Sequence, residues 1–463
     1  MTQTITTYNP STGAVLQTYE GWTAEQIEAA VEAGHAAAKA WGQQPLTVRV
    51  AAVRRLAEEL RRQAKPFAEL MTAEMGKVLA EASGEMEKSA VTALYYADNA
   101  ARILADEKAS IDNVDAWVSY EPIGLVLAVM PWNFPVWQVM RFAIPTIAAG
   151  NGVLLKHSPN VTGCALALQK LFLDAGLPKH LVTTLVVAEP QVPQVIDGLI
   201  GDDRIAAVTL TGSNRAGAAV GAAAGGAAKR SVLELGGSDA FIVLEDADLD
   251  RAVAAAVKAR FNNAGQSCVC AKRFIVAEGI AEAFTERFVQ ATQALIVGDP
   301  NDSVTQMGPL ARADLREALD SQVRRSVEAG AVLLTGGKAM EGLGSFYAPT
   351  VLGNMQPGMA AFDEETFGPV AAIAVAKGDA DAVRLANATP FGLSVSVWSG
   401  SNQRALAVAK GITSGAAFIN AMTASDARVP FGGTKKSGYG RELAAAGIRE
   451  FTNARTYWSV PSA

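Results

Sequence analysis

Three side chains have the chemical types of a nucleophile, a general base and an oxyanion donor. Cys268 follows Asn263-Ala-Gly-Gln-Ser267 in a glycine-bearing loop, and a thiolate is a strong nucleophile near neutral pH. Glu234 ends an apolar segment before two glycines, and burial raises the pKa of a carboxyl group until it can act as a base. Asn133 lies in Pro131-Trp-Asn-Phe-Pro135, where two prolines stiffen the backbone behind an amide that could face an oxyanion.

Each of these residues also has an ordinary structural explanation. A cysteine among apolar residues is usually an inert small hydrophobe, which is the interpretation we favour for Cys164 in its Ala/Leu-rich helical stretch. Glu234 could pair with a structural Arg or Lys, and the 131–135 loop could simply pack on the core. The three cysteines form neither a disulfide framework nor a C-x-x-C pair, and no histidine cluster accompanies them, so no metal site is predicted.

A nucleotide site is plausible where a predicted strand meets a helix at Thr211-Gly212-Ser213. Free backbone N–H groups and the helix dipole at such a junction suit a pyrophosphate. The usual Gly-x-Gly-x-x-Gly fingerprint is missing, since Gly217, Gly221 and Gly225 have the wrong spacing. The strand-to-helix turn alone could equally be structural.

Helices fill the first hundred residues. Thr23-Ala-Glu-Gln26 is a capping-box pattern that opens a predicted helix through about Trp41. A second predicted helix runs from about Leu46 until Pro66 interrupts it, and a third covers roughly residues 81–104.

Beyond residue 116 short apolar strands alternate with helices, which predicts parallel α/β sheets. We place a domain boundary near Gly236, after which the alternation resumes. The predicted strands lie near 116–120, 124–130, 153–155, 184–187, 207–210, 241–244, 273–277, 369–375, 394–398 and 416–419, and the predicted helices near 162–175, 191–199, 214–224 and 249–261.

Composition excludes several classes of protein. At 463 residues the chain exceeds what one core usually supports, so two or three lobes are expected. A net charge of −6 argues against a nucleic-acid partner, and no basic run suggests a membrane surface. Met1 to Asn9 has neither a charged nor an apolar leader region, and no stretch approaches a membrane span, so a cytoplasmic location is expected.

Six motifs, in this order and spacing, resemble the aldehyde dehydrogenase superfamily over essentially the whole chain. The resemblance implies an α/β fold with two parallel-sheet domains and a small β oligomerisation arm. It assigns 1–111 and 123–236 to an NAD(P)-binding domain, 237–445 to a catalytic domain, and 112–122 with 446–463 to the arm. The motifs are Pro-Trp-Asn-Phe-Pro at 131–135, Leu-Thr-Gly-Ser at 210–213, Glu-Leu-Gly-Gly at 234–237, Gly-Gln-Ser-Cys at 265–268, Glu-Glu-Thr-Phe-Gly-Pro at 364–369 and Pro-Phe-Gly-Gly-x-Lys-x-Ser-Gly-x-Gly-Arg-Glu at 430–442.

The resemblance also implies the reaction. Cys268 would attack an aldehyde, Asn133 and the Cys268 backbone N–H would stabilise the oxyanion, and Glu234 would activate water to hydrolyse the thioester left after hydride loss. The implied cofactor is NAD or NADP, because Pro159 stands where many NAD-preferring relatives have a Glu that repels a 2′-phosphate. The implied cofactor-binding residues are Trp132, Lys156, Ser158, Gly212, Ser213, Leu235, Glu365 and Phe367.

Within the superfamily the chain looks most like the succinate-semialdehyde dehydrogenases. That likeness implies that Arg141 and Ser425, with Trp137, bind a substrate whose distal end is a carboxylate, which the donor fork of an arginine fits well. Some relatives have a second substrate-binding arginine where this chain has Asn262, and Arg428 is the predicted substitute.

Alternatives stay open beside this interpretation. They are a broad-specificity aliphatic aldehyde dehydrogenase, a CoA-acylating relative, which retention of Glu234 disfavours, and a non-catalytic binding protein on the same fold. Cys270 could form a reversible disulfide with Cys268 or be a buried bystander. Extended segments near 112–122 and 455–460 predict strand pairing between subunits, hence a homodimer or homotetramer.

Overall fold

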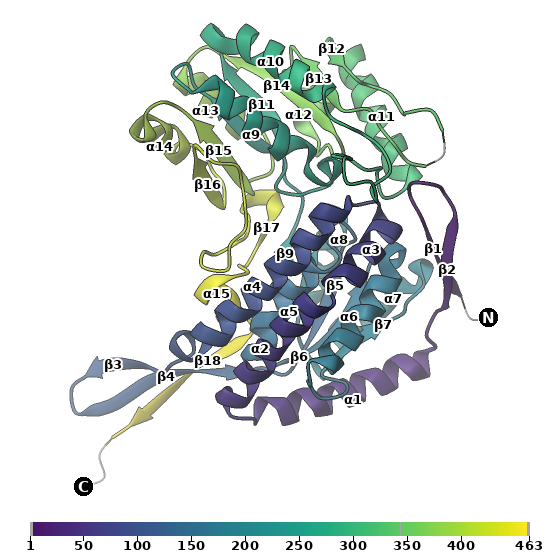
Figure 1. Cartoon of the computed structure of the whole chain (residues 1–463). Helices are drawn as coiled ribbons and strands as arrows, with labels where there is room; N and C mark the ends of the chain where they lie inside the picture. The colour runs from purple at the N-terminus through teal and green to yellow at the C-terminus, as the bar shows by residue number, and fades with distance from the viewer. Residues whose placement is uncertain (1–2, 343, 461–463) are drawn as a thin grey trace.

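Two β-sheets, each covered by helices, form the two lobes of this protein, as its computed structural model shows (Figure 1). The structure describes residues 3–342 and 344–460. Residues 1–2 and 461–463, at the ends of the predicted domain ranges, lie outside the described part, as does residue 343. The α/β fold class predicted from the sequence is confirmed.

Four helices open the chain after a short hairpin of β1 (Thr4–Tyr8) and β2 (Val15–Glu20). The capping box is present, because the Thr23 side chain accepts from Gln26 N–H and the Gln26 side chain accepts from Thr23 N–H. The second helix ends earlier than predicted, and Pro66 instead lies in the first turn of the next helix, where its missing N–H leaves no hydrogen bond unmade. The helices are α1 (Ala24–Gly42), α2 (Leu46–Arg62), α3 (Ala64–Met75) and α4 (Leu79–Ile103).

The first lobe contains a six-stranded sheet in the order β17-β9-β8-β5-β6-β7. Its strands run parallel except for the short edge strand β17, which pairs antiparallel with β9. The strands are β5 (Leu125–Met130), β6 (Gly152–His157), β7 (Val182–Leu185), β8 (Ile205–Thr211), β9 (Arg230–Glu234) and β17 (Gly438–Tyr439), and the later helices of this lobe are α5 (Trp137–Ala148), α6 (Thr162–Asp174), α7 (Val192–Gly201) and α8 (Asn214–Gly226).

The second lobe contains a seven-stranded sheet in the order β12-β13-β14-β11-β10-β15-β16, also parallel except at the β12 edge. The chain enters it between Glu234, at the end of β9, and Asp239, at the start of β10. Its elements are β10 (Asp239–Val243), α9 (Leu249–Phe261), β11 (Ala271–Ala277), α10 (Ala281–Gln293), α11 (Ala313–Glu328), β12 (Val332–Thr335), β13 (Thr350–Gly353), α12 (Ala360–Asp363), β14 (Val370–Ala376), α13 (Asp379–Asn387), β15 (Ser394–Trp398), α14 (Asn402–Lys410) and β16 (Ala416–Ile419).

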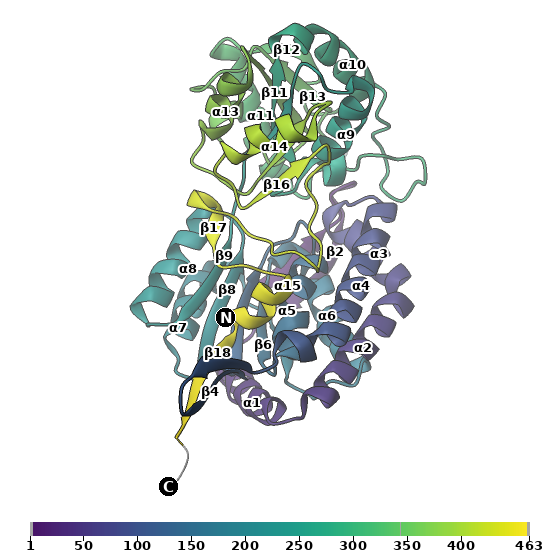
Figure 2. The same ribbon diagram turned by 90° about the vertical axis from the view of Figure 1, so that its left-hand side faces the viewer.

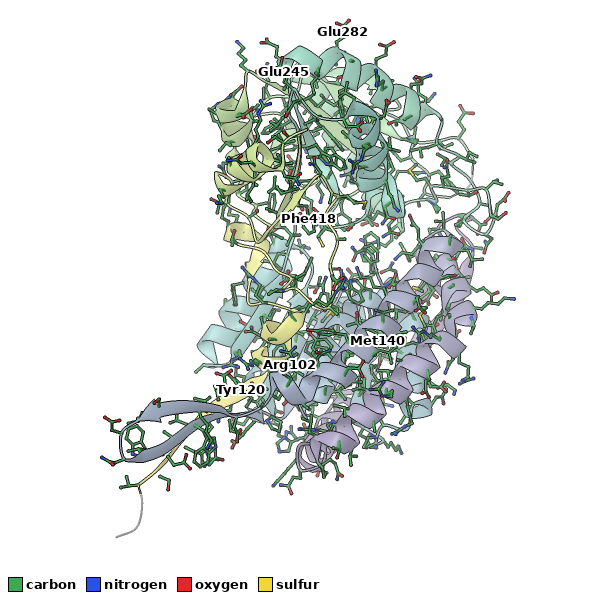
Figure 3. All side chains as sticks on the ribbon, turned by 60° about the vertical axis from the view of Figure 1, so that its left-hand side comes forward. Arg102, Tyr120, Met140, Glu245, Glu282 and Phe418 are labelled. Atoms are coloured by element: carbon green, nitrogen blue, oxygen red, sulfur yellow. The ribbon has the colours of Figure 1, made fainter. Side chains whose placement is uncertain are left out.

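A three-stranded sheet projects from the first lobe (Figure 2). It pairs β18 (Thr452–Ser459) with β4 (Val114–Pro122) and β4 with β3 (Glu107–Ile111). The rings of Trp117 and Tyr457 stack across the strands with centroids 5.0 Å apart. Figure 3 shows Tyr120 near the base of this arm and Met140 of α5 inside the lobe.

Two boundaries predicted from the sequence need correction. The arm begins at Glu107 rather than at residue 112, because β3 is a further strand of the same sheet. The chain leaves the second lobe before residue 445, since β17 already pairs with β9 and α15 (Ala444–Glu450) packs against α5. Backbone pairing of Gly438 with Glu234 therefore brings the C-terminal motif to the end of β9.

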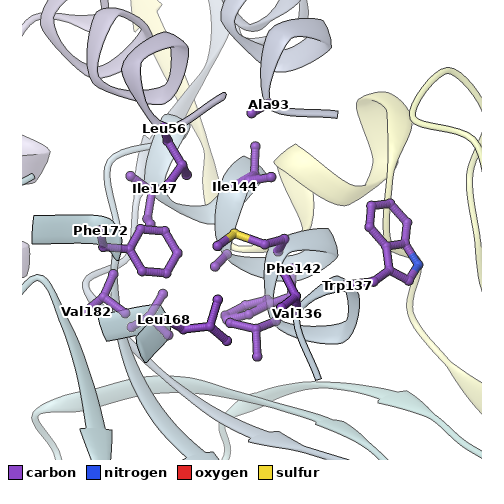
Figure 4. Close-up of a cluster of buried hydrophobic side chains, with 14 of the residues drawn as sticks. Leu56, Ala93, Val136, Trp137, Phe142, Ile144, Ile147, Leu168, Phe172 and Val182 are labelled. Carbon is purple, nitrogen blue, oxygen red and sulfur yellow. The ribbon is translucent and has the colours of Figure 1, made fainter. Parts of the chain in front are cut away.

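Helix α5 lies in the middle of the first lobe, and all of its residues are buried. Ile144 and Ile147 pack among Leu56, Leu168 and Phe172, whereas Trp137 lies on the side nearest the yellow C-terminal segment (Figure 4). The helix is thus fixed in the core on one side and presents residues toward the interface between the lobes on the other. No helix within the described ranges is both long and apolar enough to cross a membrane.

Candidate active site

Cys268 lies between two cavities. One, of about 180 Å³, is also lined by Lys88, Trp137, Arg141, Thr423 and Ser425. The other, of about 320 Å³, is also lined by Asn133, Ser213, Glu234, Glu365 and Phe367. Nearly all the predicted site residues therefore line one or the other of the two cavities that Cys268 lines.

The loop that carries Cys268 has an unusual backbone. Helix α9 ends at Phe261, and Asn263, Ala264 and Gly265 then follow with φ values of 53°, 51° and 72°. A left-handed conformation at a residue with a side chain costs about 1–2 kcal/mol, so the surroundings must hold this turn. Glu81 of α4 accepts the Asn263 N–H at 3.0 Å, and Arg260 donates to the Gly265 carbonyl at 3.0 Å.

Asn133 is tied to the same loop. Its side-chain Nδ2 donates to the Gln266 carbonyl at 3.0 Å, and the Asn263 side chain donates to the Asn133 carbonyl at 2.8 Å. Because both residues are buried, these bonds fix the amide beside the segment that ends in Cys268. The second N–H of the Asn133 amide has no protein acceptor among the described residues, so it is available to an oxyanion.

Lys272 holds the backbone of the nucleophile by hydrogen bonds. Its buried Nζ donates to the carbonyls of Ser267 and Cys268 at 3.0 and 2.9 Å and lies 3.4 Å from Glu365. Burial raises the pKa of Cys268 to about 12, although the charges of Arg141 and Lys272 oppose that rise. The thiol is therefore protonated at neutral pH, and its reaction requires a base.

Glu234 is a carboxyl group in an apolar setting. It ends β9, is 3% exposed, and neither of its carboxyl oxygens has a hydrogen-bond partner among the described residues. Burial, and next the charge of Glu442, raise its pKa well above the ordinary range, while Arg141 opposes them. A Cβ at Gly432 would lie 2.6 Å from its Oε1, so that glycine leaves space for the carboxyl group.

The predicted substrate residues divide into two groups. Arg141, Trp137 and Ser425 line the smaller cavity with Cys268. Arg141 is not a free cation, because it forms a buried ion pair with Glu442 and lies 4.4 Å from the ring centroid of Phe431.

Arg428 does not line either cavity that Cys268 lines. Its side chain is 76% exposed and pairs at 2.7 Å with Asp426, which lies two positions earlier in the chain. The structure therefore gives no support to Arg428 as the substitute for a second substrate-binding arginine.

The larger cavity has features that suit the pyrophosphate and nicotinamide parts of a dinucleotide. Gly212 and Ser213 lie where β8 meets α8, and the Ser213 side chain caps that helix by accepting the Ala216 N–H at 3.3 Å. The remaining N–H groups of the first turn suit a pyrophosphate, and Trp132 and Phe367 form an edge-to-face apolar wall with centroids 5.7 Å apart. Six of the eight predicted cofactor residues line this cavity, namely Trp132, Gly212, Ser213, Leu235, Glu365 and Phe367.

The other two predicted cofactor residues lie elsewhere. Ser158 lines a separate cavity of about 620 Å³ near the N-terminal hairpin, where Glu189 also lies. Lys156, at the end of β6, is buried, and burial lowers its pKa to about 8.

Glu365, which lines the larger cavity, accepts the Gly237 N–H at 3.0 Å in this structure.

Three charged residues at the site were not predicted from the sequence. Lys88, Lys272 and Glu442 stand next to Ser425, Cys268 and Arg141, respectively. Glu442 closes the last of the six motifs, so its place in that motif was an available signal. Lys88 lies within an ordinary helical pattern and carried no signal.

Glu85 holds the helix that carries Arg141 and Trp137. Its Oε1 accepts the N–H groups of Val136 and Trp137 at 2.8 and 2.7 Å, and its other oxygen pairs with buried Lys77. We expect Glu85→Ala to lower the free energy of unfolding by about 3–5 kcal/mol, because it leaves a buried ammonium unpaired and uncaps α5. Urea unfolding followed by fluorescence measures the loss.

The matched control for this prediction is Glu87→Ala, because Glu87 lies on α4 as Glu85 does. Glu87 pairs with Arg61 at the surface, where both side chains are about half exposed. Loss of an exposed pair costs about 0–1 kcal/mol. Equal effects of the two substitutions would contradict the anchoring role of Glu85.

Comparison with known proteins gives a consistent result. The profile of the aldehyde dehydrogenase family matches residues 1–457. The NAD(P)+ succinate semialdehyde dehydrogenase Sad of Escherichia coli K12 is 49% identical over 450 residues, which cover 97% of this chain and 96% of that protein. A probable succinate-semialdehyde dehydrogenase (NADP+) of a Synechocystis species is 45% identical over 98% of this chain and 99% of its own.

Solved structures are similar over the whole chain as well. Succinic semialdehyde dehydrogenase from Streptococcus pyogenes, solved in complex with NADP+, is 36% identical with a TM-score of 0.95 and covers 99% of this chain and 100% of its own. Betaine aldehyde dehydrogenase from Staphylococcus aureus, solved with NAD+, is 28% identical with a TM-score of 0.94 and covers 100% of this chain and 95% of its own.

Proposed function

The chain belongs to the aldehyde dehydrogenase family, and on that premise we propose that it oxidises succinate semialdehyde to succinate with NAD or NADP. The observation that carries the proposal is the position of Cys268 between two cavities. The smaller cavity has a thiol together with cationic and hydroxyl groups, which suits a short aldehyde with a distal carboxylate. The relatives of highest identity described above carry the same activity in their names.

Chemistry begins with the sulfur. The Cys268 thiol transfers its proton to solvent water in the cavity, and Sγ forms a bond to the aldehyde carbon while the carbonyl π electrons move to oxygen. The Cys268 backbone N–H and the free N–H of Asn133 donate to that oxyanion, because the Gln266 and Asn263 bonds hold the amide in place. A nicotinamide dinucleotide in the larger cavity supplies the hydride acceptor.

Glu234 completes the cycle. Hydride loss leaves a thioester on Cys268, and water must then attack its carbonyl carbon. Glu234 accepts a proton from that water, the C–S bond breaks, and the sulfur departs as thiolate. The raised pKa of Glu234 makes it a stronger base than an exposed carboxylate, and the space beside Gly432 lets the carboxyl group approach.

We propose that both NAD and NADP are accepted. Pro159 begins the short 3₁₀ helix Pro159–Val161 after β6 and offers no carboxylate to repel a 2′-phosphate. Ser158 precedes it with its Oγ bonded to Asn160 at 2.7 Å. Lys156, Ser158 and Gly212 are the proposed adenosine and pyrophosphate ligands, and Glu365 with Phe367 the proposed nicotinamide-side ligands.

The larger organisation is part of the same proposal. The first lobe is proposed to bind the cofactor and the second to supply the nucleophile. The arm of β3, β4 and β18 exposes strand edges, which supports a homodimer or homotetramer in which arms pair with neighbouring subunits. A cytoplasmic location is proposed because the three cysteines are free and Cys268 must stay reduced.

The substrate is tested directly by a panel of aldehydes. We expect succinate semialdehyde to give the highest kcat/KM of the panel. The rates are measured from the absorbance of the reduced nicotinamide, with each cofactor in turn. An uncharged aldehyde of similar length, such as butanal, is the comparison. Equal kcat/KM values for the two would contradict a site built for a distal carboxylate.

The role of Arg141 is tested by removing its charge together with that of its partner. Arg141→Met alone would leave Glu442 buried and unpaired, so we pair it with Glu442→Gln. The ratio of kcat/KM for succinate semialdehyde to that for butanal is expected to fall about 30-fold, because a hydrogen bond between charged groups is lost. An unchanged ratio in the double variant would exclude Arg141 as a carboxylate ligand.

A further inference from the structure

Lys88 reaches the smaller cavity from a helix of the first lobe. It lies on α4, is partly buried, and its Nζ donates to Ser425 Oγ at 2.7 Å. The same Nζ lies 4.4 Å from the ring centroid of Trp137. Lys88 and Cys268 line the same cavity of about 180 Å³.

The other charges near this cavity are already paired. Arg141 pairs with Glu442, Lys77 with Glu85, and Arg428 with Asp426. No carboxylate in residues 3–342 and 344–460 forms an ion pair with Lys88. Among the described residues that line this cavity, both Lys88 and Arg141 are cationic, and Lys88 is the one without an ion-pair partner.

A partly buried cation without a counter-charge is unfavourable until an anion joins it. Burial, and next the Arg141 guanidinium, lower the pKa of Lys88 to about 8, while Glu85, Asp426 and Cys268 oppose the shift. An ammonium group has three N–H donors. One is directed to Ser425 and one side faces the Trp137 ring, which leaves a donor for a ligand in the cavity.

We propose that Lys88 binds the distal carboxylate of the substrate together with Ser425 and Arg141. This assignment rests on the proposed function, since it requires a substrate with a carboxylate remote from its aldehyde. Asn262 lines the cavity but brings no charge, so Lys88 supplies the cation that complements the paired Arg141. Lys88 thereby sets specificity between charged and uncharged aldehydes of the same length.

The test compares two substrates in three variants. We expect Lys88→Met to lower the ratio of kcat/KM for succinate semialdehyde to that for butanal about 30-fold, mainly through KM. Lys88→Arg restores most of the ratio, because it restores the charge. The matched control Lys65→Met removes an exposed lysine on α3 and leaves the ratio unchanged.

The pH dependence separates charge from mere support of the loop at Ser425. In the wild type, KM for succinate semialdehyde rises as pH increases through about 8, because the free Lys88 ammonium loses its proton there. In Lys88→Arg the guanidinium stays charged, so the rise disappears. A purely structural lysine would give a similar rise for butanal.

The outcomes distinguish this inference from the proposed function. If the wild type shows no preference for succinate semialdehyde, the proposed substrate is wrong. If the wild type shows the preference and Lys88→Met keeps it, Lys88 is not a carboxylate ligand while the proposed function stands. If Lys88→Met loses activity on both substrates equally, the residue supports the fold of the cavity and the inference also fails.

Discussion

Cys268→Ser is expected to lower kcat for aldehyde oxidation by at least about 10⁴-fold, because an alcohol is a far weaker nucleophile than a thiol and its adduct collapses less readily. The substitution changes one atom, and the loop bonds from Glu81, Asn133 and Lys272 do not involve the sulfur. The loss is therefore one of chemistry rather than of fold. Initial rates of nicotinamide reduction at saturating aldehyde measure it.

Cys164→Ala is the control for this result. Cys164 is fully buried in α6 and lines neither of the two cavities next to Cys268, and Glu74 accepts its backbone N–H. Its removal is expected to lower stability by about 1 kcal/mol and to leave kcat within about threefold of the wild type. Comparable losses in both variants would point to unfolding rather than to a role for the Cys268 sulfur.

Glu234→Gln is expected to separate hydride transfer from hydrolysis. The amide keeps the size of the side chain but accepts no proton, so steady-state kcat falls about 10³-fold. Attack by Cys268 does not require the water that Glu234 activates, so the first turnover persists and one equivalent of reduced nicotinamide forms in a burst. Stopped-flow absorbance measures both phases, and loss of the burst together with the steady state would contradict a hydrolytic role.

The pH profile of the wild type follows from the same residue. Glu234 acts as a base only when ionised, and burial with Glu442 raises its pKa well above the ordinary range. The rate of thioester hydrolysis should therefore increase with pH above the usual titration range of a carboxyl group. In Glu234→Gln that dependence should vanish, which assigns the titration to this carboxyl group.

Local signals in the sequence explain what could be predicted of the fold. The Thr23–Gln26 capping box fixed the start of α1, and buried apolar runs such as those of β8 and β10 predicted parallel strands. β3 was missed because its five residues are all exposed and show no alternation. β17 was missed because a strand of two residues has no period, and its pairing depends on residues far away in the chain.

At the active site, too, local sequence signals predict residues within motifs but not contacts between distant parts of the chain. Cys268, Glu234 and Asn133 could be predicted because each lies in a distinctive short motif. Lys88 could not, because its meeting with Ser425 joins positions 337 residues apart and depends on how the two lobes pack. The pairing of Arg141 with Glu442, and of Arg428 with Asp426, likewise decides which arginine faces the cavity, and a sequence pattern does not show how such charges are paired.

Mass spectrometry of Glu234→Gln, quenched after the burst with succinate semialdehyde and NADP, tests covalent catalysis by Cys268 most directly. A thioester on the sulfur predicts one succinyl group per subunit, located on the peptide that contains Cys268. A burst of reduced nicotinamide with that peptide unmodified would contradict it, because the hydride would then have left a carbon that was never bonded to the sulfur.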